Sequence, residues 1–584
     1  MGTKGQSFIS GAFTLMVSAA IVKVIGALFK IPLAAVLGGE GMGYYMTAYS
    51  MFNPVFALSV AGFSVSVSKL CSAAAAQGRV NDKNKIFSTA LLLFPAIGLM
   101  LSLLIFAAAP YFVHAVDNPA ALNSVRAMAP SLFFCCITAV FRGYFEGSRN
   151  MMPTAVSQIA ESVTKLLIGL IFAYRCVSAA SLEFEQFGTV FGTKAKDAQA
   201  AMSVAAPYAA SAAIAGVAVS TAMGCFIMMV SFLIIDKERE NQKKAVVTTT
   251  AAALALIKTA VPVCAGAVVV NMASLVDLFS VMNRINNAAA LDWPTMCRSI
   301  PELLLADIEP QHAANFLYGS YTGLAMTVFN LAPALTASMG ICALPMISAL
   351  AATGKRVLLR QRIESVVRIT IITAMPLGMG MSAMAEPILL SLFKGNPYEA
   401  AVAARLLKTM GIASVFVAIS GAVNSMLQAV GRIYAPVKIL MIGSIIKLAI
   451  NWFLISKPGI SILGAPWGTL CCYLFITLAA TYALMHAVEG DIGLFPMMIK
   501  PAAASAVCCV ASRFCFAKAL EIVSFRAATA VSIVVAGGIY IAFLVIIGGI
   551  YDSDLKLLDN NSKLKKLLVF CRGIPCKSHY NAVE

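Results

Sequence analysis

The chain has 584 residues, of which 60% are hydrophobic and only 12% are charged, and its mean hydropathy is +0.86. These values exclude a soluble globular protein and indicate a chain that crosses a membrane many times. The formal net charge of +17 lies mostly in short polar segments between apolar runs. That distribution is typical of membrane topology and of contact with anionic lipid, so we do not expect a nucleic-acid partner.

Apolar segments of at least about 20 residues predict the membrane-spanning helices, because that length crosses a hydrocarbon core of roughly 30 Å. The sequence predicts an all-α polytopic membrane protein with about 14 transmembrane helices. They cover approximately residues 8–36, 42–72, 86–113, 121–146, 152–176, 202–235, 251–284, 315–350, 361–392, 399–429, 434–456, 460–488, 499–522 and 526–550. The longer polar segments 177–201 and 285–314 are predicted as outer loops.

Lysine and arginine residues gather in alternate polar segments, including 237–244 and the tail 551–584. Cytoplasmic loops of membrane proteins carry an excess of these residues. An even number of spans places both termini on the same side. We therefore predict that both termini and the basic tail are cytoplasmic.

The two halves of the chain repeat a pattern with the same predicted orientation. It pairs Gly147, Arg149, Pro153 and Lys165 with Gly431, Arg432, Pro436 and Lys447. Parallel repeats of this kind predict two pseudo-symmetric lobes with a substrate site between them near the membrane midplane. The predicted parts are an N-terminal lobe at 1–240, a C-terminal lobe at 241–490, two additional helices at 491–550 and the tail at 551–584.

Lysines inside the apolar segments are the first candidates for substrate binding, since a charge at mid-bilayer costs roughly 3 kcal/mol or more unless it faces a wet cavity or a partner. Lys23 and Lys30 are seven residues apart and share one helix face. Their stripe is suited to an anionic headgroup. The alternative for Lys30 is a side chain that reaches the membrane interface.

Two further lysines have polar companions one helical turn away. Glu161 and Lys165 are four residues apart, which predicts a charge pair that is either structural or part of the site. Lys447 and Asn451 have the same spacing and are predicted to line the second lobe's part of the cavity. For Lys165 and Lys447, contact with substrate and a structural role are equally favoured.

Asp277 and Arg284, seven residues apart, are the charged candidates in the seventh span. Three roles remain open for Asp277: a pair with Lys447, a ligand for a coupling cation, or a switch between the two. Arg284 either binds substrate or marks the membrane interface. A monovalent cation or the membrane potential is thus the expected energy source, with no other cofactor.

Motifs for ATP hydrolysis and metal-dependent hydrolysis, GxxxxGK[ST] and HExxH, do not occur in the sequence. No plausible nucleophile and base set accompanies the spans, so we do not expect an enzyme. In the tail, Cys571 and Cys576 lack the companion ligands of a zinc site, and we expect no bound metal.

Several stretches resemble one known group, the SpoVB/MurJ-type lipid-linked oligosaccharide flippases of the multidrug/oligosaccharidyl-lipid/polysaccharide exporter superfamily. They are EGMGYYMTAY (40–49), AGFSVSVSKL (61–70), RGYFEGSRNMMPTAVSQI (142–159) and LYGSYTGLAMT (317–327). The resemblance is closer to SpoVB, a sporulation protein, than to MurJ. Lys23 stands where MurJ proteins carry an arginine, and Gly319 to Tyr321 stand where they carry an acidic and arginine pair.

The resemblance implies a bacterial plasma-membrane transporter that flips an undecaprenyl-pyrophosphate-linked glycan, with lipid II the favoured substrate and cell-wall synthesis proteins as partners. It implies alternating access of two lobes around a basic cavity. Two other hypotheses remain. A cation-coupled multidrug exporter needs an acidic or aromatic cavity, and a membrane scaffold that transports nothing would tolerate loss of the four intramembrane lysines.

Overall fold

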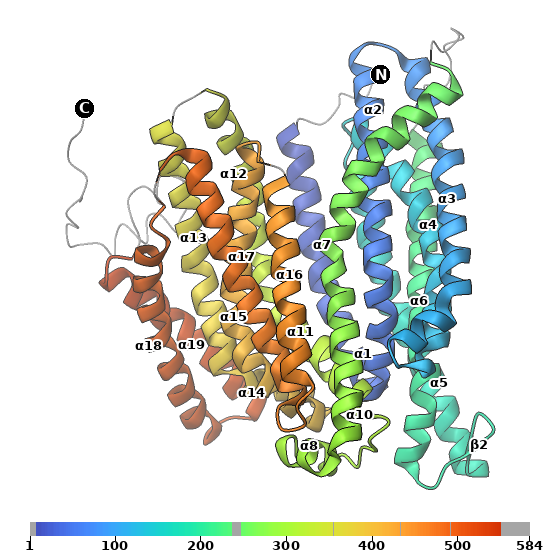
Figure 1. The fold of residues 1–584 in the computed structure, drawn as a ribbon, viewed down its shortest axis with the longest axis vertical. Helices are drawn as coiled ribbons and strands as arrows, with labels where there is room; N and C mark the ends of the chain where they lie inside the picture. Colours follow the sequence, from blue (N-terminus) through green and yellow to red (C-terminus); the bar gives the residue numbers. More distant parts are fainter. Residues whose placement is uncertain (1–7, 236–246, 354–355, 433, 491, 550–584) are drawn as a thin grey trace. The chain divides into compact units, whose positions relative to one another are not determined.

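The computed structural model describes residues 8–235, 247–353, 356–432, 434–490 and 492–549. Within them the chain is almost entirely helical (Figure 1). Among the described residues, twelve segments are long and apolar enough to span a membrane, and one of these, Val17–Ala76, has 60 residues, enough for two crossings. The protein is a multi-pass membrane protein, as its composition predicts. The tail at 551–584 and the basic run at 237–244 lie outside the described residues.

The helices of the first part of the chain follow the predicted spans closely. They are α1 (Phe8–Ala57), the π-helical turn η1 (Leu58–Phe63), α2 (Ser64–Ala76), α3 (Val80–Ala115), the short η2 (Pro119–Ala121), α4 (Leu122–Gly147), α5 (Met152–Phe187), α6 (Ala198–Ile235) and α7 (Thr249–Leu291). Within α1, Gly38 has a φ of 67° and breaks the helix. This kink separates the predicted spans 8–36 and 42–72, and glycine adopts the required backbone conformation at little cost.

The remaining helices complete the predicted set. They are α8 (Trp293–Ser299), α9 (Glu302–Leu305), α10 (Ala313–Gly319), the π-helical η3 (Ser320–Ala325), α11 (Met326–Phe329), α12 (Leu331–Ala352), α13 (Arg356–Ala383), α14 (Ala385–Leu392), α15 (Pro397–Ala429), α16 (Tyr434–Ile455), η4 (Ser461–Gly464), α17 (Ala465–Val488), α18 (Leu494–Leu520) and α19 (Phe525–Ile546). The predicted span 315–350 is a chain of shorter elements from α10 to α12. About 14 crossings follow when α1 is counted as two and α10–α12 as one.

The two predicted outer loops are largely ordered secondary structure, which corrects the sequence-based expectation. Helix α5 continues to Phe187, and a hairpin of β1 (Thr189–Val190) and β2 (Thr193–Lys194) leads into α6 (Figure 1). Glu183 accepts hydrogen bonds from the backbone N–H groups of Phe191 and Gly192 at 3.0 and 3.2 Å. The hydropathy of the sequence indicates where a helix leaves the lipid. The helix can continue beyond that point, and it ends where other groups form the hydrogen bonds of its last backbone carbonyl groups.

Contacts divide the chain into two compact units. The first unit contains Met1–Thr327, Phe393–Ala403 and Leu448–Ala465, and the second contains Val328–Leu392, Ala404–Lys447 and Pro466–Glu584. The lobe boundary at residue 240 is not the boundary of these units and stays a prediction. In the first unit, Phe63 stacks on Phe94 with ring centroids 4.2 Å apart. The core of the second unit is aliphatic and includes Ile363, Ile371 and Ile419.

Candidate functional site

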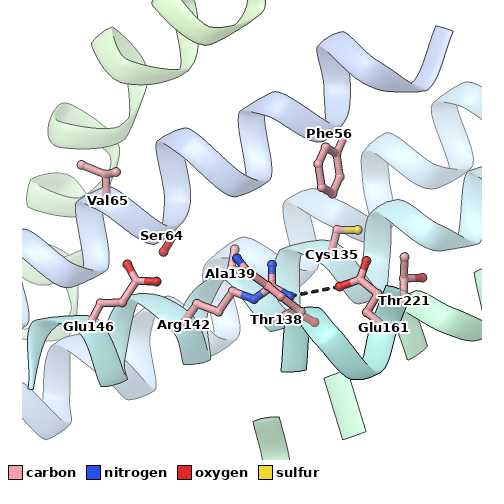
Figure 2. Close-up of a pocket in the computed structure, with 11 residues that line it drawn as sticks. Phe56, Ser64, Val65, Cys135, Thr138, Ala139, Arg142, Glu146, Glu161 and Thr221 are labelled. Atoms are coloured by element: carbon pink, nitrogen blue, oxygen red, sulfur yellow. Dashed lines mark hydrogen bonds and ion pairs between the residues drawn. The ribbon is translucent and has the colours of Figure 1, made fainter. Parts of the chain in front are cut away.

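A polar cavity of about 190 Å³ lies inside the first unit, among α1, α2, α4, α5 and α6 (Figure 2). Its lining combines charged, polar and apolar side chains from these five helices: Phe56, Ser64, Val65, Cys135, Thr138, Ala139, Arg142, Glu146, Gln158, Glu161 and Thr221. One cation and two carboxyl groups therefore surround a space within a helical bundle whose length and composition suit a membrane. Such groups are costly in lipid and mark functional sites by default.

An ion pair between Arg142 of α4 and Glu161 of α5 is the centre of this cavity. Arg142 Nη2 donates to Glu161 Oε2 at 3.0 Å (Figure 2). Arg142 Nε and Nη2 also lie 3.4 and 3.3 Å from Ser157 Oγ. Ser157 and Glu161 are one turn apart on α5, so the N–H donors of the planar guanidinium group reach both side chains. Arg142 is only 8% exposed. The pairing offsets much of the cost of burying each charge.

Local backbone features make room for the pair. A Cβ at Gly224 of α6 would lie 3.1 Å from Glu161 Oε2, so the absence of a side chain at Gly224 leaves space for the Glu161 carboxylate. The π-helical turn Leu58–Phe63 stands between Phe56 and Ser64, which both line the cavity. A π turn widens a helix locally and is frequent at functional sites.

Lys165 has a different partner from the one its spacing predicts. Its Nζ donates a hydrogen bond to the Tyr49 hydroxyl at 2.7 Å and lies 4.8 and 5.3 Å from the ring centroids of Tyr49 and Phe29. Glu161, expected to pair with Lys165, is held by Arg142 instead. Glu161 and Lys165 are one helical turn apart, but their partners come from other helices. The Arg142 guanidinium group on α4 binds the carboxylate, and the Tyr49 hydroxyl and the Tyr49 and Phe29 rings on α1 contact the ammonium group.

Aromatic side chains on α1 connect the surroundings of Lys165 with the cavity. Tyr45, Tyr49, Phe52 and Phe56 recur every three or four residues, and neighbouring ring centroids are 5.0 to 6.2 Å apart. This is the spacing of one helix face. Sequence reasoning missed these rings and Arg142, although the recurrence of aromatic residues at positions 45 to 56 was a usable signal.

The predicted lysine stripe on α1 has two unlike members. Lys23 is exposed, whereas Lys30 is partly buried. Lys30 directly follows Phe29, whose ring centroid lies 5.3 Å from Lys165 Nζ. The structure therefore brings Lys30 and Lys165 of the predicted set into one part of the first unit, and it leaves Lys23 at the unit's surface.

Asp277, Arg284 and Asn451 also belong to the first unit. Asp277 is 6% exposed and Asn451 is fully buried. Asn451 Nδ2 donates to Ser280 Oγ at 3.3 Å, and the Arg284 guanidinium lies over the Trp452 ring, 3.1 Å from its centroid. A cation over an indole face is a favourable contact.

Lys447, at 5% exposure, belongs to the second unit. Its pairing with Asp277 joins residues of different units and stays a prediction.

A separate polar cluster surrounds the kink of α1. Gly39 N donates to Glu399 Oε1 at 2.8 Å, and the Tyr44 hydroxyl donates to Glu40 Oε1 at 2.9 Å. His312, in the segment before α10, places Nδ1 2.6 Å from Glu40 Oε1. The hydrogen bond to the Glu40 carboxylate raises the pKa of His312 above its usual value.

A family model for polysaccharide biosynthesis proteins matches residues 8–351, more than half of the chain. The chain belongs to this family. A second model, MatE, matches residues 320–453. Over 529 residues the chain is 23% identical to stage V sporulation protein B of Bacillus subtilis (strain 168), covering 90% of this chain and 92% of that relative. The resemblance to SpoVB/MurJ-type proteins is thereby confirmed.

Solved structures show the same fold. "Lipid II flippase MurJ, inward closed conformation" has a TM-score of 0.59 and 14% identity, covering 92% of this chain and 98% of that one. An inward-facing multidrug resistance transporter of the MATE family also has a TM-score of 0.59, with 12% identity, and covers 82% of this chain and 99% of that one. At these identities the likeness concerns the fold alone.

Proposed function

We propose that this protein is a flippase that moves a lipid-linked glycan from the inner to the outer leaflet of the bacterial plasma membrane, with both termini in the cytoplasm. Membership in the polysaccharide biosynthesis family and likeness to proteins named as a sporulation protein and a lipid II flippase support this proposal. Lipid II, the undecaprenyl-pyrophosphate-linked peptidoglycan precursor, is the favoured substrate. Proteins of cell-wall synthesis are the expected partners.

The observation that carries the proposal is the group of cations held within the membrane-spanning helices of the first unit. Tyr49 and Phe29 hold Lys165, and Lys30 directly follows Phe29 on α1. Glu161 holds Arg142. A pyrophosphate is a strong acceptor for ammonium groups. Lysines suit a moving headgroup because each is a point charge with rotatable donors, so the contact does not require one fixed ligand orientation.

The mechanism consistent with these residues is alternating access, in which the headgroup enters the basic site while the polyprenyl chain stays in lipid. Binding to the lysines neutralises the headgroup's charge during its passage through a region of low dielectric. No bond is made or broken. Asp277, buried in α7, is the proposed site of charge coupling, driven by a monovalent cation or by the membrane potential.

Rescue of bacteria depleted of their lipid II flippase tests the proposal. The parent protein is expected to restore growth, and Lys165→Met, Lys30→Ala and Lys447→Ala are expected to fail at equal membrane abundance. Lys518→Ala is the matched control, because Lys518 is exposed and pairs only locally with Glu521 at 3.2 Å. If the well-expressed parent does not rescue, lipid II is the wrong substrate. If all lysine variants rescue as well as the parent, the basic site is wrong.

A multidrug exporter is the second candidate, favoured by the MatE match and by the two carboxyl groups in the Arg142 cavity. It predicts that expression in an efflux-deficient strain raises resistance to cationic drugs, and that Glu161→Gln abolishes the gain. An unchanged resistance profile, together with rescue of the flippase-depleted strain, would reject this candidate.

A further inference from the structure

A second pocket, of about 410 Å³, lies entirely in the second unit, between α13, α15 and α18. Its lining contains two basic residues and no carboxylate: Met379, Ser382, Ala383, Lys408, Ile412, Cys509, Val510 and Arg513. None of these residues belongs to the candidate site of the first unit. A charge pattern of this kind, inside helices suited to a membrane, calls for an anion.

Close contact between α13 and α15 forms one wall of this groove. A Cβ at Gly378 would lie 2.6 Å from the Gly411 carbonyl oxygen, and a Cβ at Gly411 would lie 2.6 Å from the Gly378 carbonyl oxygen. The two backbones therefore touch where neither residue has a side chain. One turn further along, the Ser382 hydroxyl donates to the backbone carbonyl of Lys408. These contacts fix the position of Lys408 at the groove.

Arg513 of α18 forms the opposite side. Its Nε donates to the carbonyl oxygen of Ala383, the last residue of α13, at 3.2 Å. This bond satisfies a carbonyl at the helix end and orients the guanidinium group. It uses one of the five N–H donors of the arginine. In the part of the chain that the structure describes, neither Arg513 nor Lys408 is in an ion pair with a carboxylate.

Both cations lie well inside helices that are long enough to span a membrane. Lys408 lies about 17 Å from the start of α15 and Arg513 about 11 Å from the end of α18, at 1.5 Å per residue. Beside them, Ile412 is 44% and Val510 is 72% exposed. Charged heads next to exposed aliphatic side chains match an amphiphile, with its anionic group at the cations and its chain along the apolar residues.

We propose that this groove binds one anionic phospholipid, with its phosphate between Lys408 and Arg513 and an acyl chain along Ile412 and Val510. Charge complementarity selects this occupant, because two cations without a carboxylate partner favour a phosphate with net negative charge over a zwitterionic headgroup. The site is separate from the basic site of the proposed transport function. It serves as a fixed lipid contact that neutralises both charges within the bilayer.

Native mass spectrometry of the full chain, released from detergent after addition of phosphatidylglycerol or phosphatidylethanolamine, tests this site. The parent protein is expected to retain one phosphatidylglycerol molecule in preference to phosphatidylethanolamine. Lys408→Gln is expected to weaken retention about fivefold, and Lys408→Gln/Arg513→Gln more strongly, since each basic residue near the membrane surface contributes similarly. Lys518→Gln, a change of an exposed cation on the same helix as Arg513, is the matched control and is expected to retain the lipid.

A charge-preserving double variant, Lys408→Arg/Arg513→Lys, separates lipid binding from folding. It is expected to keep phosphatidylglycerol while the neutral double variant loses it. Equal retention by the neutral variant and the parent would overturn the proposal, as would equal retention of phosphatidylethanolamine. Loss of lipid from both double variants would also overturn it, because the groove would then depend on local packing and not on charge.

Discussion

The helix pair α4–α5 and the helix pair α15–α16 carry the same repeated pattern, but their lysines differ in exposure. Lys165 is partly buried and bonded to Tyr49, whereas Lys447 is only 5% exposed. At the offset of 283 that aligns Pro153 with Pro436, Arg142 and Glu161 fall on Ser425 and Ser444; at the offset of 282 that aligns the two lysines, Glu161 falls on Gly443.

Unlike the charged pair, which joins two helices, each of these serines forms a hydrogen bond within its own helix. Ser425 and Ser444 donate to the carbonyl oxygens of Gly421 and Leu440, each four residues back on its own helix. The ion pair of the first repeat therefore has no counterpart in the second. The repeat preserves glycine and proline positions that shape helix ends, and it does not preserve the charge network. Likeness of sequence in the two halves does not imply two equivalent sites.

The strongest test of this difference is Arg142→Ala. It leaves the Glu161 carboxylate without its cation and is expected to lower the free energy of unfolding by about 3 kcal/mol, because a partly buried charge loses its partner. Ser425→Ala, at the equivalent position, is expected to cost less than about 1 kcal/mol. Denaturant unfolding in detergent measures both. Equal stability of the two variants would mean that the ion pair contributes nothing.

The contribution of charge complementarity can be separated from that of burial by Arg142→Met/Glu161→Met. This double variant removes both charges and is expected to be more stable than Arg142→Ala, since no carboxylate remains unpaired. The same denaturant series measures it. A double variant less stable than Arg142→Ala would assign the effect to the shape of the cavity.

A smaller effect is expected for Lys165→Met, which removes the ammonium from Tyr49 and Phe29. Loss of one hydrogen bond and the cation–π contacts is expected to cost about 1 to 2 kcal/mol. Transport is expected to fall much further than stability. The readouts are thermal unfolding and growth of the flippase-depleted strain at matched abundance. A loss of growth in proportion to a loss of folded protein would contradict a substrate-binding role.

Tyr49→Phe is a milder change because it keeps the ring and removes only the hydroxyl that accepts from Lys165. We expect it to cost about 1 kcal/mol or less. Thermal unfolding beside Lys165→Met gives the comparison. If Tyr49→Phe is as harmful as Lys165→Met, the hydroxyl and not the aromatic faces holds the ammonium.

The smallest effect concerns His312 and Glu40, a pair that depends on pH. The pKa of His312 is raised by its hydrogen bond to Glu40, so its stabilising contribution is complete below the unfolded value of about 6.5 and is lost as pH rises through the raised pKa. Thermal stability is therefore expected to fall slightly as pH rises above about 6.5. His312→Gln is expected to remove this part of the pH dependence. An unchanged pH profile in the variant would contradict the assignment.

The sequence by itself determined the membrane class, the approximate spans and the break between the first two helices. Transfer into lipid depends on the hydropathy of about 20 consecutive residues, which can be read in one dimension. It also predicted a pair between Glu161 and Lys165, but the structure pairs Glu161 with Arg142. The extension of α5 to Phe187 could not be read in this way, since hydropathy does not report where a helix ends once it has left lipid.

Only the tertiary structure decided which charge meets which. Arg142 lies within the predicted span 121–146, near the end of α4, and only the packing of α4 against α5 brings it to Glu161. The aromatic faces that hold Lys165 come from α1, more than a hundred residues away. The spacing of residues along a helix shows which of them lie on the same face. Which residues of other helices they contact depends on how the neighbouring helices are rotated and how closely they pack.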